Sequence, residues 1–400
     1  MRPGFALLII NLAFSPIFAR TKMDSATVHV TLDHNRIIIT VGIYLPNGKM
    51  ERVRAWVDNG NPSMSITERL ANELELKPPY GSSDSGMVKV PERILIGDMQ
   101  LWLTNLKQPV EVEKAKSVGA GINADITLSS TMLQNYDIVI DYPGKKFTIA
   151  SPGTIHFQGK AVNGYFNPQN SLIQIPAKLD SGEFNLALDI GTPVSFISRD
   201  LISKWSKDHA SWPSMHGAIG VANLWGMEDE PQWQLLRINN MLYGGIVFSN
   251  FIAVSCPQSW LDYFIKRVGI PTAGLVGAEA LLDYRLGIDY THGIVYFQHI
   301  GNSVRADMDL VGITLRPEAD GRYSILGVAD YNGKLSVAGV LKGDILQKVN
   351  NNNVNGLTMG EVWSLLHGRP GTVYTLVLDR DGKQFTVKTK VHRFLGKRPG

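Results

Sequence analysis

An internal repeat constrains the fold of this 400-residue chain more than any other feature of its sequence. The segment Ala55–Thr67 matches Leu186–Ser198, and both reduce to two apolar residues followed by Asp-x-Gly-x-Pro-x-x-x-Ile-(Ser/Thr). Each copy places an aspartate, Asp58 or Asp189, where an apolar strand runs into a turn. A repeat of this length indicates a duplicated structural unit rather than two unrelated turns.

A second pair of matching segments supports the duplication. Leu133–Tyr142 corresponds to Leu281–Tyr290, and each is followed by a turn and a β-rich run. Because both pairs occur in the same order, we expect one domain at 26–152 and its copy at 153–300. Short runs rich in Val, Ile and Thr, with turn residues between them, predict that both domains are mainly β.

The first residues of the chain have the pattern of an export signal. Arg2 precedes a mostly apolar stretch up to Phe18, and Ala19 offers a small residue for cleavage, so 1–19 is predicted to be a signal peptide. The alternative is a buried N-terminal helix, which Asn11 and Pro16 would interrupt. The apolar stretch is shorter than the roughly 20 residues of a membrane span. We therefore expect a periplasmic or secreted protein without a membrane span.

The pattern changes after residue 300. Short strand-like runs surround an amphipathic helix predicted at Met359–His367, and Asp381-Gly382 marks a turn between two closing strands. We expect a third, small α+β domain at 301–396, long enough to form its own core.

Composition excludes several functional classes. The 39 basic and 36 acidic residues give a net charge of +3 without a basic stripe, so nucleic acid is not an expected partner. The single cysteine, Cys256, excludes an internal disulfide and a cysteine-based zinc cluster. The nine histidines are scattered, and a glycine-rich segment at Gly119–Ala124 lacks the strand and helix of a dinucleotide site. We expect no metal and no cofactor.

Two copies of Asp-x-Gly predict a paired-carboxylate site. The glycine lets the backbone turn closely behind the carboxylate. If pseudo-twofold symmetry brings Asp58 and Asp189 to within about 3 Å, they share one proton, so that one activates water while the other polarises a carbonyl. The alternative is an ordinary turn, because Asp-x-Gly is common and recurs in this chain at Asp180-Ser181-Gly182.

These motifs resemble the retropepsin/pepsin superfamily of aspartic peptidases, in the two-lobed single-chain form of bacterial secreted proteins. In that family a later hydrophobic-hydrophobic-Gly strand threads behind the catalytic turn. Leu275-Val276-Gly277 has that pattern in the second lobe, and Ser129 replaces the glycine in the first. The glycine-containing segments 217–220 and 81–90 are candidates for the family's flap hairpins.

The resemblance implies two pseudo-symmetric β lobes and an endopeptidase with Asp58 and Asp189 as catalytic residues. Gly60 and Gly191 would provide the turns, and the substrate would be a peptide or protein. Family members carry Thr or Ser after each aspartate, which hydrogen-bonds across the pseudo-dyad, and a hydroxyl one residue beyond the glycine, which holds the outer carboxylate oxygen. In this chain Thr192 supplies that hydroxyl in the second lobe.

Three residues depart from the family pattern around the aspartates. Asn59 and Ile190 follow the two aspartates, and only Asn59 can hydrogen-bond through its side chain. In the first lobe Asn61 would replace the hydroxyl through its amide. The altered support leaves an alternative open: an inactive pseudo-protease that binds peptides.

The third domain resembles bacterial PDZ domains. Ala338–Ile345 (AGVLKGDI) matches that family's Ala-Gly-Leu-x-x-Gly-Asp-x-(Ile/Leu) segment. The resemblance implies that Leu310, Val311, Gly312 and Ile313 form a loop whose N–H groups bind the C-terminal carboxylate of a peptide, which adds as an extra strand. A PDZ adaptor with inert lobes and a small domain that packs for stability are the alternatives.

Overall fold

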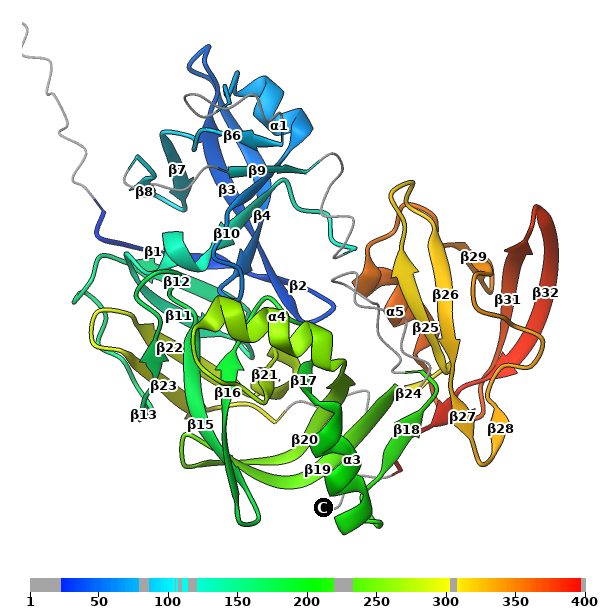
Figure 1. Cartoon of the computed structure of the whole chain (residues 1–400). Coiled ribbons are helices and arrows are strands. Elements are labelled where there is room, and N and C mark those ends of the chain that lie inside the picture. The colour runs from blue at the N-terminus through cyan, green and yellow to red at the C-terminus, as the bar shows by residue number, and fades with distance from the viewer. Residues whose placement is uncertain are drawn as a thin grey trace, which may run out of the picture.

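The computed structural model describes residues 23–78, 86–104, 106, 110–113, 121–218, 233–302 and 308–396. Figure 1 shows two β-rich lobes and a smaller third unit with its own sheet and helix. The mainly β fold class predicted from the sequence is confirmed. The predicted signal peptide lies outside the described residues. Among the helices that the structure describes, none is long and apolar enough to cross a bilayer.

Lobe 1 is built on a sheet with the strand order β6-β9-β5-β10-β4-β3-β7-β8, and β2 pairs with β3. Its strands are β2 (Thr31–Asp33), β3 (Arg36–Tyr44), β4 (Met50–Asp58), β5 (Ser65–Thr67), β6 (Met87–Val88), β7 (Arg93–Ile96), β8 (Met99–Trp102), β9 (Val110–Glu113) and β10 (Ile126–Ser129). Two short helices, α1 (Glu68–Glu73) and α2 (Ser130–Leu133), complete it. Strand β4 ends on Asp58, so the sheet carries this carboxylate to the edge of the lobe.

Lobe 2 repeats the arrangement with the order β14-β15-β16-β21-β17-β20-β19-β18. Its elements are β14 (Tyr165–Phe166), β15 (Ile173–Leu179), β16 (Gly182–Leu188), β17 (Ser195–Ser198), α3 (Arg199–Asp208), β18 (Ser214–His216), β19 (Gln234–Tyr243), β20 (Ile246–Cys256), α4 (Gln258–Val268), β21 (Gly274–Val276) and the 3-10 helix η2 (Ala278–Leu281). Asp189 directly follows β16, as the repeat predicted.

Each lobe threads one short strand behind its aspartate. Strand β10 runs parallel to β4, with Ser129 beside Asp58, and antiparallel to β5. Strand β21 likewise runs parallel to β16 and antiparallel to β17. Gly277 ends this thread in lobe 2, where an added β-carbon would stand 2.2 Å from the carbonyl oxygen of Val194. In lobe 1 Ser129 takes the corresponding place, and its hydroxyl hydrogen-bonds to that of Thr131 at 3.0 Å.

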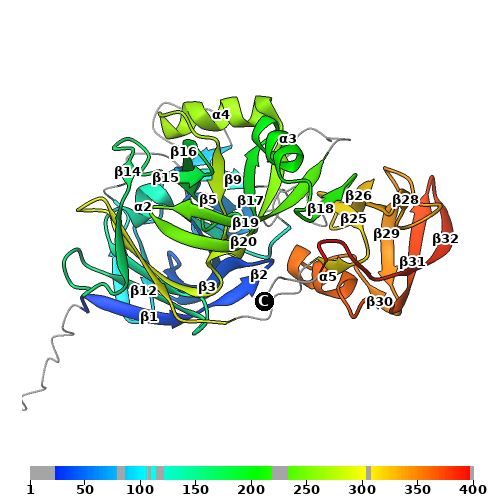
Figure 2. The same ribbon diagram turned by 90° about the horizontal axis from the view of Figure 1, so that it is seen from below.

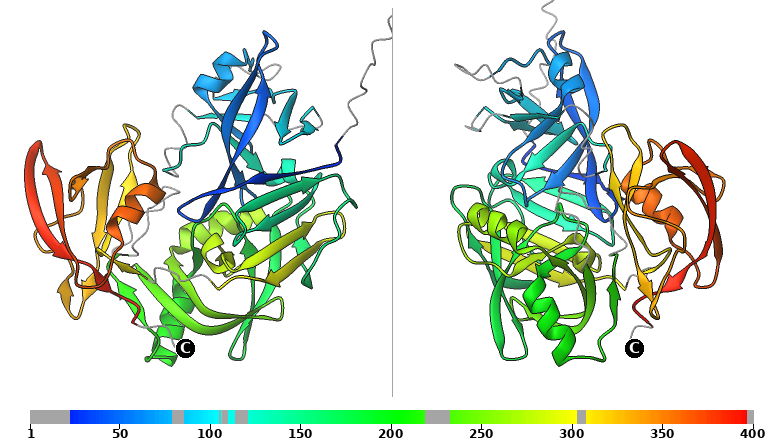
Figure 3. Two further views of the ribbon diagram at one scale, coloured as in Figure 1. Left: turned by 180° about the vertical axis from the view of Figure 1, so that it is seen from behind. Right: turned by 45° about the vertical axis from the view of Figure 1, so that its right-hand side comes forward.

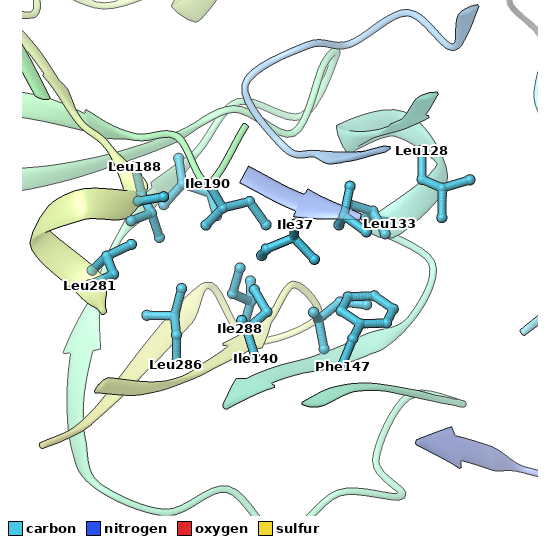
Figure 4. Packing of buried hydrophobic residues seen from close by; sticks show 14 of the residues in the cluster. Ile37, Leu128, Leu133, Ile140, Phe147, Leu188, Ile190, Leu281, Leu286 and Ile288 are labelled. Carbon is cyan, nitrogen blue, oxygen red and sulfur yellow. The ribbon is translucent and has the colours of Figure 1, made fainter. Parts of the chain in front are cut away.

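A six-stranded sheet joins the lobes in the order β1-β12-β11-β22-β23-β13. Its strands are β1 (Ser25–His29), β11 (Asp137–Asp141), β12 (Lys146–Ala150), β13 (Lys160–Asn163), β22 (Tyr284–Asp289) and β23 (Ile294–His299). The central strands, β11 and β22, lie in the second pair of matching sequence segments, one strand from each lobe. They are antiparallel, with Val139 opposite Gly287. Buried side chains of both lobes pack above it, and Figure 4 shows Ile37 of lobe 1 near Ile190 of lobe 2.

The third unit has its own core and also packs on lobe 2. Its elements are β24 (Asp309–Leu310), β25 (Ile313–Pro317), β26 (Tyr323–Val328), β27 (Asp330–Tyr331), β28 (Lys334–Leu335), β29 (Ile345–Val349), β30 (Asn352–Asn353), α5 (Met359–Leu366), β31 (Val373–Arg380), β32 (Lys383–Lys390) and β33 (His392–Arg393). Apolar side chains such as Ile325 and Val362 fill the core between its sheet and α5. Strand β27 pairs with β18 of lobe 2, and Phe394 joins that lobe's apolar cluster.

The third unit also contacts lobe 1 through α5, which faces β2 in Figure 2. The N–H of Gly360 donates to Asp33 Oδ1 at 3.0 Å, and the ring of His34 meets that of Trp363 with centroids 4.4 Å apart. The N–H of Met359 donates to the carbonyl of Gly121 at 2.7 Å. The third unit therefore bridges the two lobes, and the views in Figure 3 show it beside both.

Candidate active site

The turns after β4 and β16 bring the two predicted aspartates together between the lobes. Asp58 and Asp189 are both buried. A β-carbon at Gly60 would stand 2.2 Å from Asp189 Cγ, and one at Gly191 would stand 2.1 Å from Asp58 Oδ1. Each glycine therefore lies against the carboxylate of the opposite lobe, and only a residue without a side chain fits there. The two carboxylates lie side by side across the pseudo-twofold axis.

Hydrogen bonds from the turns hold both carboxylates. The N–H of Gly60 donates to Asp58 Oδ1 at 3.0 Å. In lobe 2 the N–H groups of Gly191 and Thr192 donate to Asp189 Oδ1 at 2.9 and 3.1 Å, and the Thr192 hydroxyl donates to Oδ2 at 2.7 Å. Thr192 thus lies where the resemblance implied that a supporting hydroxyl would lie.

Asn61 is arranged differently from Thr192. Its side-chain oxygen accepts the N–H of Ser63 at 3.1 Å and Nη2 of Arg267 at 3.0 Å. The Asp58 carboxylate is approached by the backbone N–H of Asn61 rather than by its amide. The contact of Asn61 with Arg267 of lobe 2 was not expected from the sequence.

Asn59 joins the lobes at the dyad. Its Nδ2 donates to the carbonyl of Leu188 at 3.1 Å, and its Oδ1 accepts the N–H of Ile190 at 2.8 Å. One amide side chain therefore donates a hydrogen bond to the other lobe and accepts another from it. Ile190 contributes no side-chain bond and is fully buried in the interlobe core. Of the two residues that directly follow the aspartates, Asn59 of lobe 1 therefore provides side-chain hydrogen bonds across the lobes and Ile190 of lobe 2 provides packing.

Burial governs the electrostatics of the dyad. Burial and the charge of Asp189 raise the pKa of Asp58, and burial raises the pKa of Asp189 above its ordinary value. The nearby Arg267 cation lowers the pKa of both. Because two adjacent buried carboxylates cannot both ionise at low cost, the pair retains a shared proton above the ordinary aspartate range.

Two arginines near the dyad were missed by the sequence analysis. Arg36 is fully buried beside Asp33, and Arg267 reaches Asn61 from α4. Neither lies within a recognisable motif, and both act across long sequence separations. The turn between β2 and β3, which carries Asp33 and Arg36, also touches lobe 2, because Asn35 Nδ2 donates to the carbonyl of Pro193 at 3.3 Å.

The loop predicted to bind a peptide carboxylate is closed in this structure. Leu310, Val311 and Ile313 are buried, and a β-carbon at Gly312 would stand 2.4 Å from Phe394 Cζ. The N–H of Val311 donates to the carbonyl of Leu366 at 2.9 Å, and that of Ile313 to the carbonyl of Val311 at 2.8 Å. These two donors are already used within the chain.

The two flap candidates lie partly outside the described residues, which omit 79–85 and 219–232. Of the first-lobe candidate, Met87 and Val88 form β6 and pair with β9. Of the second-lobe candidate, Gly217 and Ala218 pack against the third unit near Gly327. Across the described part of the chain, no group of three or more His, Cys, Asp and Glu side chains could hold a metal ion.

Comparisons with known proteins add little to this geometry. No protein-family model and no curated protein matches the sequence. Among solved structures, the chain is similar to the crystal structure of an aspartic proteinase from Irpex lacteus, at 13% identity and a TM-score of 0.37. That match covers 69% of this chain and 98% of the other.

Proposed function

We propose that this protein is an aspartic endopeptidase that hydrolyses peptide bonds with a water molecule activated by Asp58 and Asp189. The observation that supports it most strongly is the reciprocal contact of Gly60 and Gly191 with the opposite carboxylates. This contact brings two buried acids together, which is the arrangement needed for one acid and one base at the same substrate.

The proposed reaction uses one shared proton. The ionised carboxylate removes a proton from water, the resulting hydroxide attacks the scissile carbonyl carbon, and the protonated carboxylate donates its proton to the carbonyl oxygen. The tetrahedral intermediate, a gem-diol, collapses when the peptide nitrogen takes the proton of the dyad, the C–N bond breaks, and one hydroxyl of the diol returns its proton to the dyad. The products are a new carboxyl group and a new amine, and the dyad is left with one proton.

The cross-lobe bonds of Asn59 favour an enzyme over an inert relative. The unusual residues Asn59 and Ile190 were the reason to consider an inactive pseudo-protease as an alternative. Asn59 provides both bonds that would hold the two turns in register. Geometry held this closely matters, because a displacement of about 1 Å can reduce a rate by about a hundredfold.

The setting of the activity is also part of the proposal. The predicted signal peptide places the mature protein in the periplasm or outside the cell, where its substrates would be peptides or proteins. The PDZ-like third unit would bind a peptide C-terminus only after the loop at Leu310–Ile313 releases its internal hydrogen bonds. A C-terminal peptide that binds the full chain and protects this loop from hydrogen exchange would support that function.

The activity is tested by comparing the wild-type protein with Asp58→Asn and Asp189→Asn. Each protein is incubated with a diverse peptide mixture from pH 3 to 8, and the cut sites are read by mass spectrometry. We expect pepstatin-sensitive cleavage by the wild type and none by either variant. A folded wild-type protein that cuts nothing at any pH, yet binds peptides, would instead identify a pseudo-protease.

A further inference from the structure

A partly exposed arginine, Arg267, lies beside the dyad, and its guanidinium forms no direct ion pair with any carboxylate that the structure describes. Arg267 is near the end of α4, which lies at the junction of the lobes in Figure 1. Its Nη2 donates to Asn61 Oδ1 at 3.0 Å, and its guanidinium carbon lies 5.7 Å from the ring centroid of Tyr263. Within the described part of the chain the guanidinium contacts these two neutral groups and forms no ion pair, while the backbone carbonyl of Arg267 accepts a hydrogen bond from Asn170 Nδ2.

This arrangement differs from that of seven of the thirteen other arginines that the structure describes. Side chains that pair with a carboxylate within the described ranges belong to Arg36, Arg69, Arg285, Arg316, Arg322, Arg380 and Arg393. Arg267 is instead fixed at one nitrogen by an amide, which orients the guanidinium but does not neutralise it. A guanidinium carries five donors, so four remain for a ligand.

The position of Arg267 ties it to the substrate site. Asn61 lies three residues after Asp58, and its backbone N–H approaches that carboxylate while its side chain holds Arg267. The Arg267 charge acts on both Asp58 and Asp189. Arg267 of lobe 2 is therefore anchored on the turn of lobe 1 that carries Asp58, which sets an oriented cation beside the junction of the lobes where a peptide would bind.

We propose that Arg267 is a specificity-determining residue that binds a carboxylate of the substrate near the scissile bond. The inference rests on the proposed peptidase function and names a substrate class for it: acidic peptides. The carboxylate comes either from an Asp or Glu side chain or from a nearby chain terminus, and both would form charge-assisted bonds with the planar guanidinium. Asn61 is the positioning residue that holds Arg267 in place.

The test compares full-length wild type, Arg267→Glu, Arg267→Met and a control, Lys266→Glu. Lys266 is exposed on the same helix, so its variant makes the same charge change next to Arg267 without touching Asn61. The substrates are matched peptides with Glu, Gln or Lys at each position around the scissile bond. Each is made with a free and with an amidated C-terminus, which separates a side-chain carboxylate from a terminal one.

We expect wild type and Lys266→Glu to cleave the carboxylate-bearing peptides with a kcat/KM roughly tenfold above that of the neutral ones. Arg267→Met should lose this preference, and Arg267→Glu should reverse it toward Lys. If Arg267→Glu and Lys266→Glu give the same profile, the proposal is wrong. Thermal melting of each variant verifies that it is folded, and if Arg267→Glu misfolds, the loss or retention of the preference in Arg267→Met decides.

Peptide binding to the Asp189→Asn protein separates this inference from the proposed function. Anisotropy of labelled Glu, Gln and Lys peptides gives the charge preference without cleavage. A preference for the Glu peptide that Arg267→Met abolishes supports the role of Arg267 even if the wild type never cuts. Equal binding of the three peptides overturns it even if the wild type is an active peptidase.

Discussion

Gly191 lies against the carboxylate of Asp58, so closely that a β-carbon at this position would stand 2.1 Å from Oδ1. We therefore expect Gly191→Ala to push the two turns apart and to separate the carboxylates. A displacement of about 1 Å at the reacting groups reduces the rate by about a hundredfold. The measurement is kcat/KM on a peptide that the wild type cleaves, and Gly60→Ala should behave in the same way because it meets Asp189.

Another Asp-x-Gly of the chain, Asp180-Ser181-Gly182, provides the matched control. Gly182 lies in the hairpin between β15 and β16, and an added β-carbon would meet only the carbonyl of Leu179 at an ordinary 3.4 Å. Gly182→Ala should retain wild-type activity. Equal activity of Gly191→Ala and Gly182→Ala would show that the dyad tolerates the extra carbon and that the carboxylates are not held as closely as the structure has them.

Replacing Asn59 should destabilise the junction between the lobes. Asn59→Leu removes the hydrogen bond to the carbonyl of Leu188 and leaves the N–H of Ile190 buried without its acceptor, and an unsatisfied buried donor costs about 1–3 kcal/mol. We expect a lower free energy of unfolding in urea and a large loss of activity. Asn59→Asp separates the two hydrogen bonds, because a carboxylate still accepts the N–H of Ile190 but cannot donate to the carbonyl of Leu188.

A second substitution tests whether support from one lobe suffices. In the Asn59→Thr/Ile190→Thr double variant, two hydroxyls would replace the single amide, and we expect activity to recover relative to Asn59→Leu. Recovery in the double variant but not in Asn59→Thr alone would show that the two positions act together. Full activity of Asn59→Leu would contradict a supporting role for the amide.

The charge of the dyad should make the protein less stable as the pH rises. The pKa values of Asp58 and Asp189 are raised above the value of about 4 for unfolded aspartate, so the folded state binds more protons between these values. The stabilisation that the protonated dyad contributes is therefore fully present below about pH 4. It is lost as the pH rises through the pKa values of the folded state. Asp189→Asn removes one ionisation, and its melting temperature should exceed that of the wild type by an amount that grows from pH 4 to 8.

An Asp→Asn variant of the exposed Asp180 serves as the comparison for the dyad. Asp180 lies in the hairpin turn after β15 and pairs with His209 at the surface, so this variant should not gain stability as the pH rises. A melting temperature of Asp189→Asn equal to or below that of the wild type at pH 8 would show that the dyad carries no buried charge penalty.

The repeat predicted the parts of the site that depend on short segments. Asp58 and Gly60 lie within one short motif, and the thread that ends at Ser129 is a second short segment that pairs beside it. The duplicated segments that begin at Leu133 and Leu281 lead into the strands that pair at the lobe junction. The sequence indicated only that the Asn59 side chain can hydrogen-bond. Its two partners could not be predicted, because they lie 129 and 131 residues away.

Contacts between distant segments lay beyond the reach of sequence patterns. The contact between Asn61 and Arg267 spans 206 residues, and no periodicity links a turn to the end of a helix in another lobe. The match at Ala338–Ile345 implied a ligand loop at Leu310–Ile313, but it could not indicate that the N–H of Val311 donates to the distant carbonyl of Leu366. Docking of the third unit on Asp33 depends on the folded shapes of both surfaces and likewise has no sequence signal.

His34 should make the contact between lobe 1 and the third unit sensitive to acid. Burial lowers the pKa of His34, and the nearby charges of Arg36 and His367 lower it further. Burial also lowers the pKa of His367, which Asp309 partly offsets. A histidine that is neutral when docked stabilises the contact fully above about pH 6.5 and loses this contribution as the pH falls, by up to about 2 kcal/mol at pH 5.

Hydrogen exchange measured between pH 7.5 and 5, and corrected for the intrinsic rate at each pH, can follow this contact. We expect protection of α5 and of the turn at Asp33 to fall with pH in the wild type, because a protonated His34 would stand against Arg36 beside Trp363. His34→Phe keeps a ring in the contact without the proton, so its protection should not depend on pH. His156→Phe, at an exposed position, should behave as the wild type. If His34→Phe loses protection as steeply as the wild type, another group controls the contact.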